Sequence, residues 1–205
     1  MPNWWLKRRD YKSMKTATYG RWTLLFLLAA CSQEQKSTKK FYDFDGLIDE
    51  QISQLSQRMR VLDKVAQMST THSDTTFLPT VNGWESELEI FRQLETINKP
   101  TFQNAYRITD PVEDSKSNLK IRQYVAFDVP IPVVRFYYQE EFSRLKKIDA
   151  EITEKNLLYT THRALTMEFD EEDGKPLLIR YAMSGFQKMV LRDTVRFTMK
   201  GQINW

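Results

Sequence analysis

The sequence predicts an α+β domain in which two N-terminal amphipathic helices pack on an antiparallel meander sheet of about six strands. Two observations predict this class. Apolar residues recur every three or four positions before Pro100, and beyond Pro100 they alternate with polar residues. A sheet with one apolar face and two helices with one apolar stripe each can bury these surfaces in a single layer contact.

The first predicted helix begins at Phe44 and continues to Ala66, and Asp43 or Asp45 can cap its N-terminus. Steps of three and four along this length favour one buried stripe with a polar opposite face. The polar segment that follows, residues 69–83, is predicted to be a loop. The apolar stripe consists of Phe44, Ile48, Ile52, Leu55, Met59, Leu62 and Ala66.

The second predicted helix is shorter and follows a capping box, with Asn82 as the cap and Glu85 three residues later. The string Asn98-Lys99-Pro100 ends its periodic pattern, because proline rarely continues a helix. Its apolar stripe consists of Trp84, Leu88, Phe91 and Leu94.

Beyond Pro100 the apolar residues follow a period of two, which is typical of strands. Ile131 lies between two prolines, so its segment is predicted to connect two strands. The acidic stretch that ends in Gly174 predicts a hairpin turn over residues 170–176. Leu157 is expected on the apolar face of its strand. The strands are expected at residues 119–127, 133–138, 148–152, 157–169, 177–183 and 195–203.

The first 30 residues have the pattern of a secretory signal peptide: a basic region, a short apolar core over residues 22–30 and small residues at its end. This core is shorter than the roughly 20 residues that cross a bilayer as a helix. We therefore do not expect a permanent transmembrane helix. Met14 followed by Lys15 gives a signal of more usual length than Met1 does, and we expect Met14 to be the start.

Leu28-Ala29-Ala30-Cys31 resembles a bacterial lipobox. The resemblance implies cleavage between Ala30 and Cys31, a lipid on the sulfur of Cys31 and an acyl chain on its new amino group. The alternative is an ordinary cleavage site followed by a buried free cysteine. Each buried methylene contributes about 0.8 kcal/mol, so two or three chains would hold firmly. Cys31 is the only cysteine, and its lipidation would exclude disulfides and thiol catalysis.

The residues after the cysteine predict where the anchored protein lies. Asp at the position of Ser32 retains many Gram-negative lipoproteins in the inner membrane, so Ser32 resembles an outer-membrane signal. Residues 33–36 lack the acidic cluster of surface-export tags, which favours a periplasm-facing orientation.

Residues 31–42, the cysteine and a polar stretch, predict a lipidated flexible tether, and residues 43–205 are expected to form a single domain. The whole chain has 30 Lys and Arg against 27 Asp and Glu. Six of these bases and one acid lie in the signal peptide, which leaves 24 bases and 26 acids in the mature chain. The basic balance belongs to the signal and does not indicate a nucleic-acid partner.

The polar residues do not indicate a reaction. The only histidines, His72 and His162, have no partner at ligand spacing, so no metal site is expected. The acidic residues 170–173 are consecutive and lack the spacing of a calcium loop. Glu140-Glu141 has no identifiable partner carboxylate for glycoside hydrolysis. We expect a protein that is not an enzyme and needs no cofactor.

Aromatic and methionine side chains on the apolar face leave two interpretations open. They form an ordinary core, or they line an apolar cavity between helices and sheet that holds a lipid or an acyl chain. The candidate lining residues are Tyr138, Met167, Tyr181 and Met183.

Together with the lipobox, Trp84, Glu87, Leu88, Phe91 and the string Ile97-Asn98-Lys99-Pro100 give the chain a resemblance to small outer-membrane lipoproteins of Bacteroidota. The resemblance implies an outer-membrane location and supplies no catalytic residues. The architecture is also similar to that of periplasmic lipoprotein carriers, a likeness of fold alone.

We therefore expect a lipid-anchored envelope lipoprotein with a non-enzymatic binding or structural role. Its partners would be the membrane, through the lipid on Cys31, and another envelope protein or a lipid. The alternative is a carrier or sensor of an apolar ligand held between the helices and the sheet.

Overall fold

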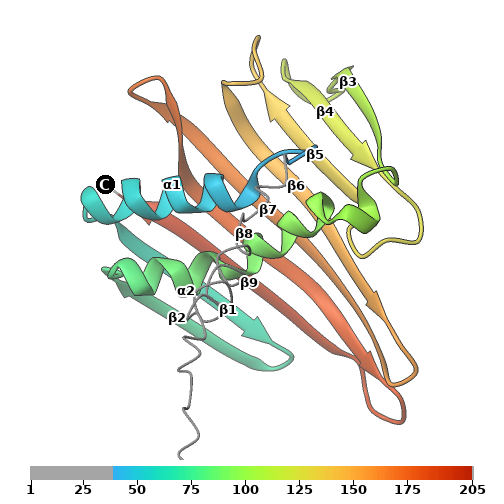
Figure 1. Cartoon of the computed structure of the whole chain (residues 1–205). Coiled ribbons are helices and arrows are strands. Elements are labelled where there is room, and N and C mark those ends of the chain that lie inside the picture. Colours follow the sequence, from blue (N-terminus) through green and yellow to red (C-terminus); the bar gives the residue numbers. More distant parts are fainter. Residues whose placement is uncertain (1–38, 205) are drawn as a thin grey trace, which may run out of the picture. The chain divides into compact units, whose positions relative to one another are not determined.

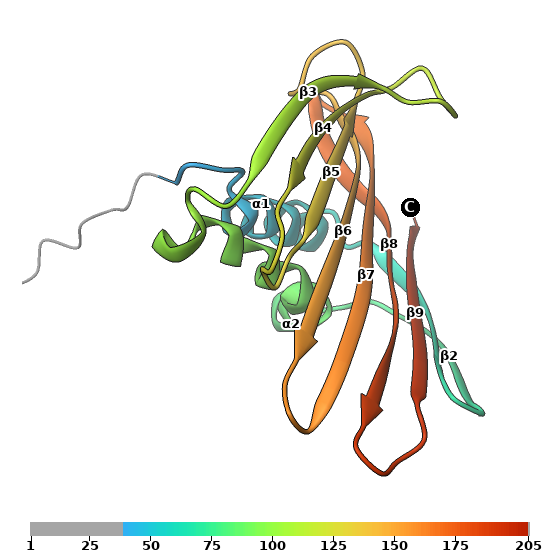
Figure 2. The same cartoon turned by 90° about the vertical axis from the view of Figure 1, so that its right-hand side faces the viewer.

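An antiparallel sheet of nine strands forms one layer of residues 39–204, which are the residues that the computed structural model describes. Two helices cover one face of this sheet (Figure 1). Seen edge-on, the helices lie against this inner face, and the outer face carries no described helix (Figure 2). The predicted α+β class is confirmed, with two helices on an antiparallel sheet. The predicted number of six strands is wrong.

The elements are, in chain order, α1 (Phe44–Gln57), β1 (Val61–Met68), β2 (Thr71–Phe77), α2 (Val81–Arg92), the 3-10 turns η1 (Gln93–Asn98) and η2 (Pro100–Phe102), β3 (Arg107–Glu113), β4 (Lys120–Val125), β5 (Val133–Tyr138), β6 (Leu145–Lys155), β7 (Tyr159–Glu172), β8 (Lys175–Met189) and β9 (Val195–Asn204). The strand order is β2-β1-β9-β8-β7-β6-β5-β4-β3. Strands β3 to β9 therefore form a meander, and the hairpin β1–β2 joins the free side of β9.

Three strands, β1, β2 and β3, lie outside the predicted set. The first helix ends at Gln57 rather than Ala66, because the chain turns at Met59, whose φ is +49°, and continues as β1. In β1, Leu62 is buried opposite Ile203 of β9. Strands β2 and β3 are the edges of the sheet and bury few side chains, so they lack the apolar alternation that predicts a strand.

The core lies between the inner face of the sheet and the helices. Asp43 caps α1 as predicted, by accepting the N–H of Gly46. The predicted cap of α2 is wrong, because Thr80 rather than Asn82 accepts the N–H of Gly83. The stripe predicted for the second helix is fully buried. The bulkiest fully buried side chains of the described residues include Trp84, Tyr181, Phe44, Phe91 and Phe136.

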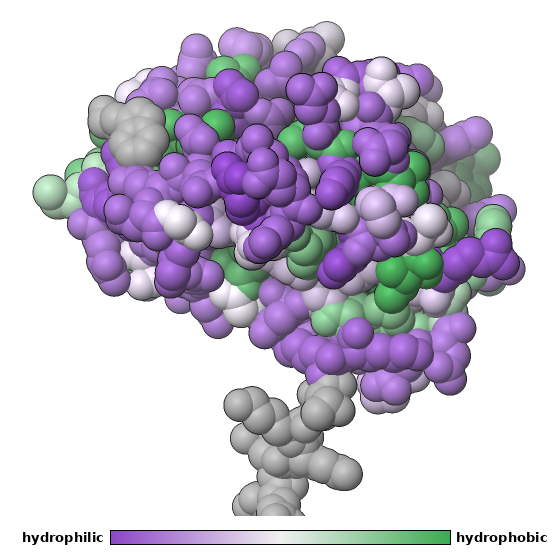
Figure 3. All heavy atoms as spheres, turned by 90° about the horizontal axis from the view of Figure 1, so that it is seen from above, coloured by the Kyte–Doolittle hydropathy of each residue, from purple (hydrophilic) through white to green (hydrophobic). Residues whose placement is uncertain are grey.

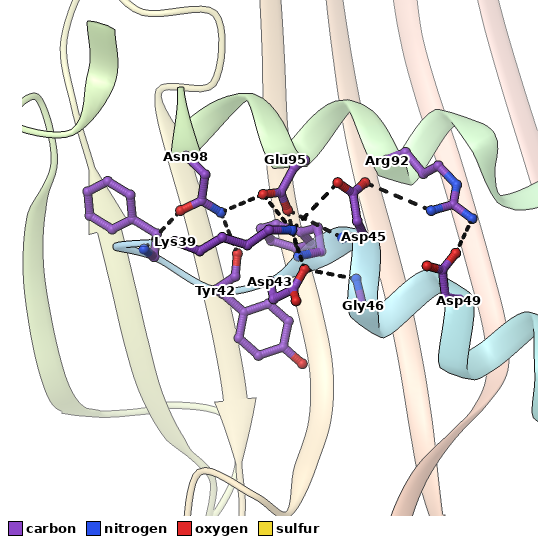
Figure 4. Close-up of polar contacts among 11 residues, drawn as sticks. Lys39, Tyr42, Asp43, Asp45, Gly46, Asp49, Arg92, Glu95 and Asn98 are labelled. Atoms are coloured by element: carbon purple, nitrogen blue, oxygen red, sulfur yellow. Dashed lines mark hydrogen bonds and ion pairs between the residues drawn. The ribbon is translucent and has the colours of Figure 1, made fainter. Parts of the chain in front are cut away.

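The segment that precedes α1 packs on η1 and does not belong to a flexible tether (Figure 4). Phe41 is a member of the core. Asn98 accepts the N–H of Phe41 and donates to the carbonyl oxygen of Tyr42, both at 2.9 Å. The folded unit therefore begins at Lys39, and the predicted boundary at residue 43 is corrected. This unit contains its own core, so it can fold alone.

Candidate functional site

The structure brings three of the four predicted ligand-lining residues together. Met167 and Tyr181 lie opposite each other on β7 and β8, and Met183 is two residues further along β8. The ring of Phe91, from α2, packs edge-on against Tyr181 with centroids 5.9 Å apart. Tyr138 lies on β5, three strands from β8, and does not join this group. A ligand-lining role for these residues stays a prediction.

A polar bridge fixes α2 on the inner face beside this group. The hydroxyl of Tyr181 donates to Glu87 of α2 at 2.8 Å, and Lys64 of β1 donates to the same carboxylate at 2.7 Å. Burial, and then the hydrogen bond to Glu87, raises the pKa of Tyr181 above its ordinary value. The phenol therefore stays protonated and serves as a donor within the fold.

Tyr138 belongs to a second polar group, at the β3 side of the sheet. Its hydroxyl donates to Asp110 of β3 at 2.5 Å, and Arg122 of β4 donates to the same carboxylate at 2.7 Å. Burial alone would raise the pKa of Asp110, but these hydrogen bonds hold it below its ordinary value of 3.8. The stability that they give is present above about pH 4 and is lost as the pH falls through the folded-state pKa.

We expect Tyr138→Phe to lower the free energy of unfolding by about 1 kcal/mol at neutral pH, because a hydrogen bond to a carboxylate is lost. The pKa of Asp110 then moves back towards its unfolded value. The variant should therefore lose less stability than the wild-type protein between about pH 5 and pH 2, as measured by urea unfolding. In an Asp110→Asn background Tyr138→Phe should leave the pH dependence unchanged. A persisting change there would contradict the assignment.

Among residues 39–204, no group of three or more His, Cys, Asp or Glu side chains is placed to hold a metal ion. His162 lies on β7 with its ring 3.4 Å from Glu151, whereas His72 lies on the edge strand β2. At the acidic turn between β7 and β8, Arg58 donates a hydrogen bond to Glu172 at 3.2 Å. The contacts of His162 and Glu172 each join neighbouring elements of the fold.

A hollow of about 430 Å³ lies on the sheet across β7, β8, β9 and β1. Two of its charged residues bond each other, Arg180 donating to Glu168 at 2.8 Å. A third, Asp63, accepts a hydrogen bond from Thr76 at 2.6 Å. Lys200, the fourth charged residue of the hollow, forms no ion pair within residues 39–204. Among its charged groups, the hollow therefore leaves only Lys200 free to orient a ligand.

Seven exposed large apolar side chains of the described residues lie in the turns at one end of the sheet. Alternate connections of a meander share an end, which places β4–β5, β6–β7 and β8–β9 together, and the β1–β2 turn joins them through the pairing of β1 with β9. Figures 1 and 2 show the turns of β6–β7 and β8–β9 as two extended tips at the lower end. We name this the apolar loop end and define it by Met68, Phe127, Leu157, Leu158, Met189, Val190 and Leu191.

The two tips are held by hydrogen bonds within and between them. In the β6–β7 turn, the side-chain oxygen of Asn156 accepts the N–H of Leu158 at 2.8 Å. The N–H of Val190, in the β8–β9 turn, donates to the carbonyl oxygen of Leu158 at 2.9 Å. The tips are thus joined, and they present Leu157, 95% exposed, and Leu191, 99% exposed, to the surroundings.

Leu191 is an unfavourable residue for its backbone conformation. Its φ is +62°, a region that favours Gly and Asn and costs a branched residue roughly 1 kcal/mol or more. It gains no burial in return, because its side chain is almost fully exposed. Local folding therefore does not explain a leucine at this position.

Basic side chains surround the two tips. Lys155 precedes the β6–β7 turn, Lys188 and Arg192 flank the apolar residues of the β8–β9 turn, and Arg196 follows on β9. All four are exposed, and none forms an ion pair with another residue of 39–204. Two exposed acids, Asp128 and Asp193, also lie in the turns at this end. The apolar loop end therefore presents apolar tips beside four bases and two acids, an excess of positive charge.

The opposite end of the sheet has a different character. Its connections β5–β6 and β7–β8 carry Glu140-Glu141 and the acidic residues 170–173. Figure 3 looks down on this end, where hydrophilic residues predominate. Met59, Leu78 and Val81 are also exposed, away from the apolar loop end. The two ends therefore differ in how many apolar side chains they expose, with the larger group at the apolar loop end.

No protein-family model, curated protein or solved structure matches the chain. Among the described residues, no helix is both long and apolar enough to cross a membrane. The lipobox, residues 28–31, with the predicted cleavage and lipidation at Ala30 and Cys31, lies outside the described residues. The anchor and the likeness to Bacteroidota lipoproteins therefore stay predictions.

The apolar loop end was not predicted from the sequence. The alternation predicts Leu157 on the apolar face of a strand, and this is wrong, because β6 ends at Lys155 and Leu157 lies in the turn. The sequence feature that could have indicated this surface is a run of consecutive apolar residues beside a basic residue. Leu157-Leu158 and Met189-Val190-Leu191 both interrupt the alternation of the neighbouring strands and lie close to Lys155 and Lys188.

Proposed function

We propose that the protein is a lipid-anchored envelope lipoprotein, held at the outer membrane through Cys31 and facing the periplasm. Its folded domain binds another envelope component through the apolar loop end, and its role is binding rather than catalysis. The lipobox at residues 28–31 supports the anchor.

The observation that carries the proposal is the concentration of exposed apolar side chains at one end of the sheet. Water-exposed surfaces rarely gather such side chains unless they bind a partner. The strained backbone of Leu191 supports the same reading, because strain without burial persists where a function requires it.

The first arm of the test concerns the anchor. The full chain, and residues 32–205 behind an ordinary cleavable secretory signal, are expressed in a Gram-negative bacterium, and the membranes are washed with high salt. We expect the full chain to stay in the outer-membrane fraction, with an N-terminal peptide that begins at Cys31 and carries lipid mass. The shortened chain should be released. An unmodified Cys31, or a full chain that is released as the shortened chain is, contradicts the anchor.

The second arm concerns the binding surface. A photo-cross-linking amino acid is placed at Leu191 and, as a matched control, at Asp173, which is exposed in the turn at the opposite end. We expect adducts with an envelope component from position 191 and few from position 173. Equal adducts from both positions contradict binding through the apolar loop end.

A further inference from the structure

We propose that the envelope component bound by the apolar loop end is a phospholipid surface with anionic headgroups, into which the tips of β6–β7 and β8–β9 insert. This inference rests on the proposed function and names its partner.

The exposure of the tips favours a fluid partner over a protein. A side chain that is exposed on nearly every side, as Leu157 and Leu191 are, is buried only by a medium that surrounds it. A protein would need a matching pit for each tip, whereas lipid chains close around them. The composition of the tips also favours a lipid partner. Hot spots of protein interfaces are enriched in Trp, Tyr and Arg, whereas the tips carry Leu, Met and Val.

The backbone of the tips suits an apolar environment. Unpaired N–H and C=O groups are costly within a bilayer, because no water is present to bond them. Here the N–H groups of Leu158 and Val190 are already bonded within and between the turns, and the N–H of Arg192 donates to the carbonyl oxygen of Met189 at 3.4 Å. The tips can leave water at a reduced cost.

The charges identify the kind of surface and the depth of insertion. Lys155, Lys188, Arg192 and Arg196 lack ion-pair partners within residues 39–204, so they are free to contact anionic headgroups. Lys188 and Arg192 enclose three apolar residues, which limits entry to the boundary between headgroups and acyl chains. Long basic side chains can keep their charges in the headgroup layer while the tips enter.

The test uses residues 39–205, which contain the core and no cysteine. Leu191→Cys and, as a matched control, Leu78→Cys are each labelled with nitrobenzoxadiazole; Leu78 is exposed and follows β2 at the end away from the tips. The probe is a vesicle of phosphatidylethanolamine and phosphatidylglycerol. We expect the label at position 191 to brighten and to be quenched by nitroxide lipids, and the label at position 78 to stay unchanged.

Substitutions sharpen the result. The double variant Leu157→Glu/Leu191→Glu should weaken vesicle binding about tenfold or more, because two apolar tips are lost and two acids face the anionic surface. Its melting temperature should match that of the wild-type protein, since both side chains are exposed. Leu78→Glu should bind as the wild-type protein does. Salt, or vesicles of phosphatidylcholine alone, should weaken binding.

Two results would overturn the inference: a label at position 191 that stays in water, or equal vesicle binding by the double variant and Leu78→Glu. The cross-linking arm then separates the consequences. Protein adducts from position 191 in cells would preserve binding through the apolar loop end with a protein as the partner. No adduct from position 191 would remove the proposed binding surface as well.

Discussion

Replacing Gly201 by alanine is expected to lower the free energy of unfolding by about 3 kcal/mol, at the upper end of overpacking costs. Gly201 lies on β9 opposite Tyr181 of β8, whose ring crosses it. A Cβ atom at Gly201 would lie 2.3 Å from two carbons of that ring. The ring cannot move aside freely, because its hydroxyl is bonded to Glu87 at 2.8 Å. Urea unfolding at neutral pH measures the loss.

The control for this prediction is Lys200→Ala, an exposed change on the same strand, which should alter stability by no more than about 0.5 kcal/mol. In a Tyr181→Leu background, Gly201→Ala should cost no more than about 1 kcal/mol, because the clash is removed. If Gly201→Ala matched Lys200→Ala, the close packing of Tyr181 on Gly201 would be wrong.

Glu95→Ala is expected to lower the free energy of unfolding by about 2 kcal/mol, because Glu95 caps α1 from outside the helix. Its carboxylate accepts the N–H groups of Phe44 and Asp45, at 2.9 and 3.3 Å. Asn98 and Lys39 donate to its other oxygen, both at 2.9 Å (Figure 4). Calorimetry measures the stability, and hydrogen exchange should show faster exchange at the two capped amides.

Two variants bracket the effect of Glu95. Glu95→Gln keeps one carbonyl acceptor and loses the charge. Its free energy of unfolding should therefore lie between those of the wild-type protein and Glu95→Ala. Asp49→Ala removes an exposed ion pair with Arg92 and should cost less than about 1 kcal/mol. The amides of Phe44 and Asp45 should exchange faster in Glu95→Ala than in Asp49→Ala. Equal exchange rates in the two variants would show that the cap contributes nothing.

The parts of the fold that could be predicted are those in which burial on one side imposes a period. The stripe that begins at Phe44 and the one that begins at Trp84 follow from contact with the sheet, and the strands beyond Leu119 follow from their alternation. The hairpin turn at residues 170–176 could also be predicted, because Gly174 adopts a positive φ of 74°.

The hairpin β1–β2 could not be predicted in this way. Leu62 and Ala66 continue the helical period of the preceding stripe, yet they lie in a strand. These residues form a strand and not a helix because they pair with Ile203 and Met199 of β9. Such a contact between distant residues cannot be recognised in the local sequence pattern. The neighbouring edge strand β2 is polar throughout most of its length, so it resembles a loop.

The apolar loop end also depends on contacts between distant parts of the chain, so the local sequence pattern does not predict it. Leu157 and Leu191 come from two separate hairpins, and only the strand order brings their turns to the same end of the sheet. The bond from Val190 to Leu158 then joins them. A sequence shows that a turn is apolar, but a surface made of several turns requires the topology.

Because β1 pairs with β9, the sheet is completed late in folding. Asp63 and Asn204, hydrogen-bonded across these strands, are 141 residues apart in the chain, and contacts of such separation slow folding. The hairpin β1–β2 can join the sheet only when β9, a strand of 10 residues close to the C-terminus, is present. A chain exported in the unfolded state would therefore keep its sheet incomplete until β9 had been made.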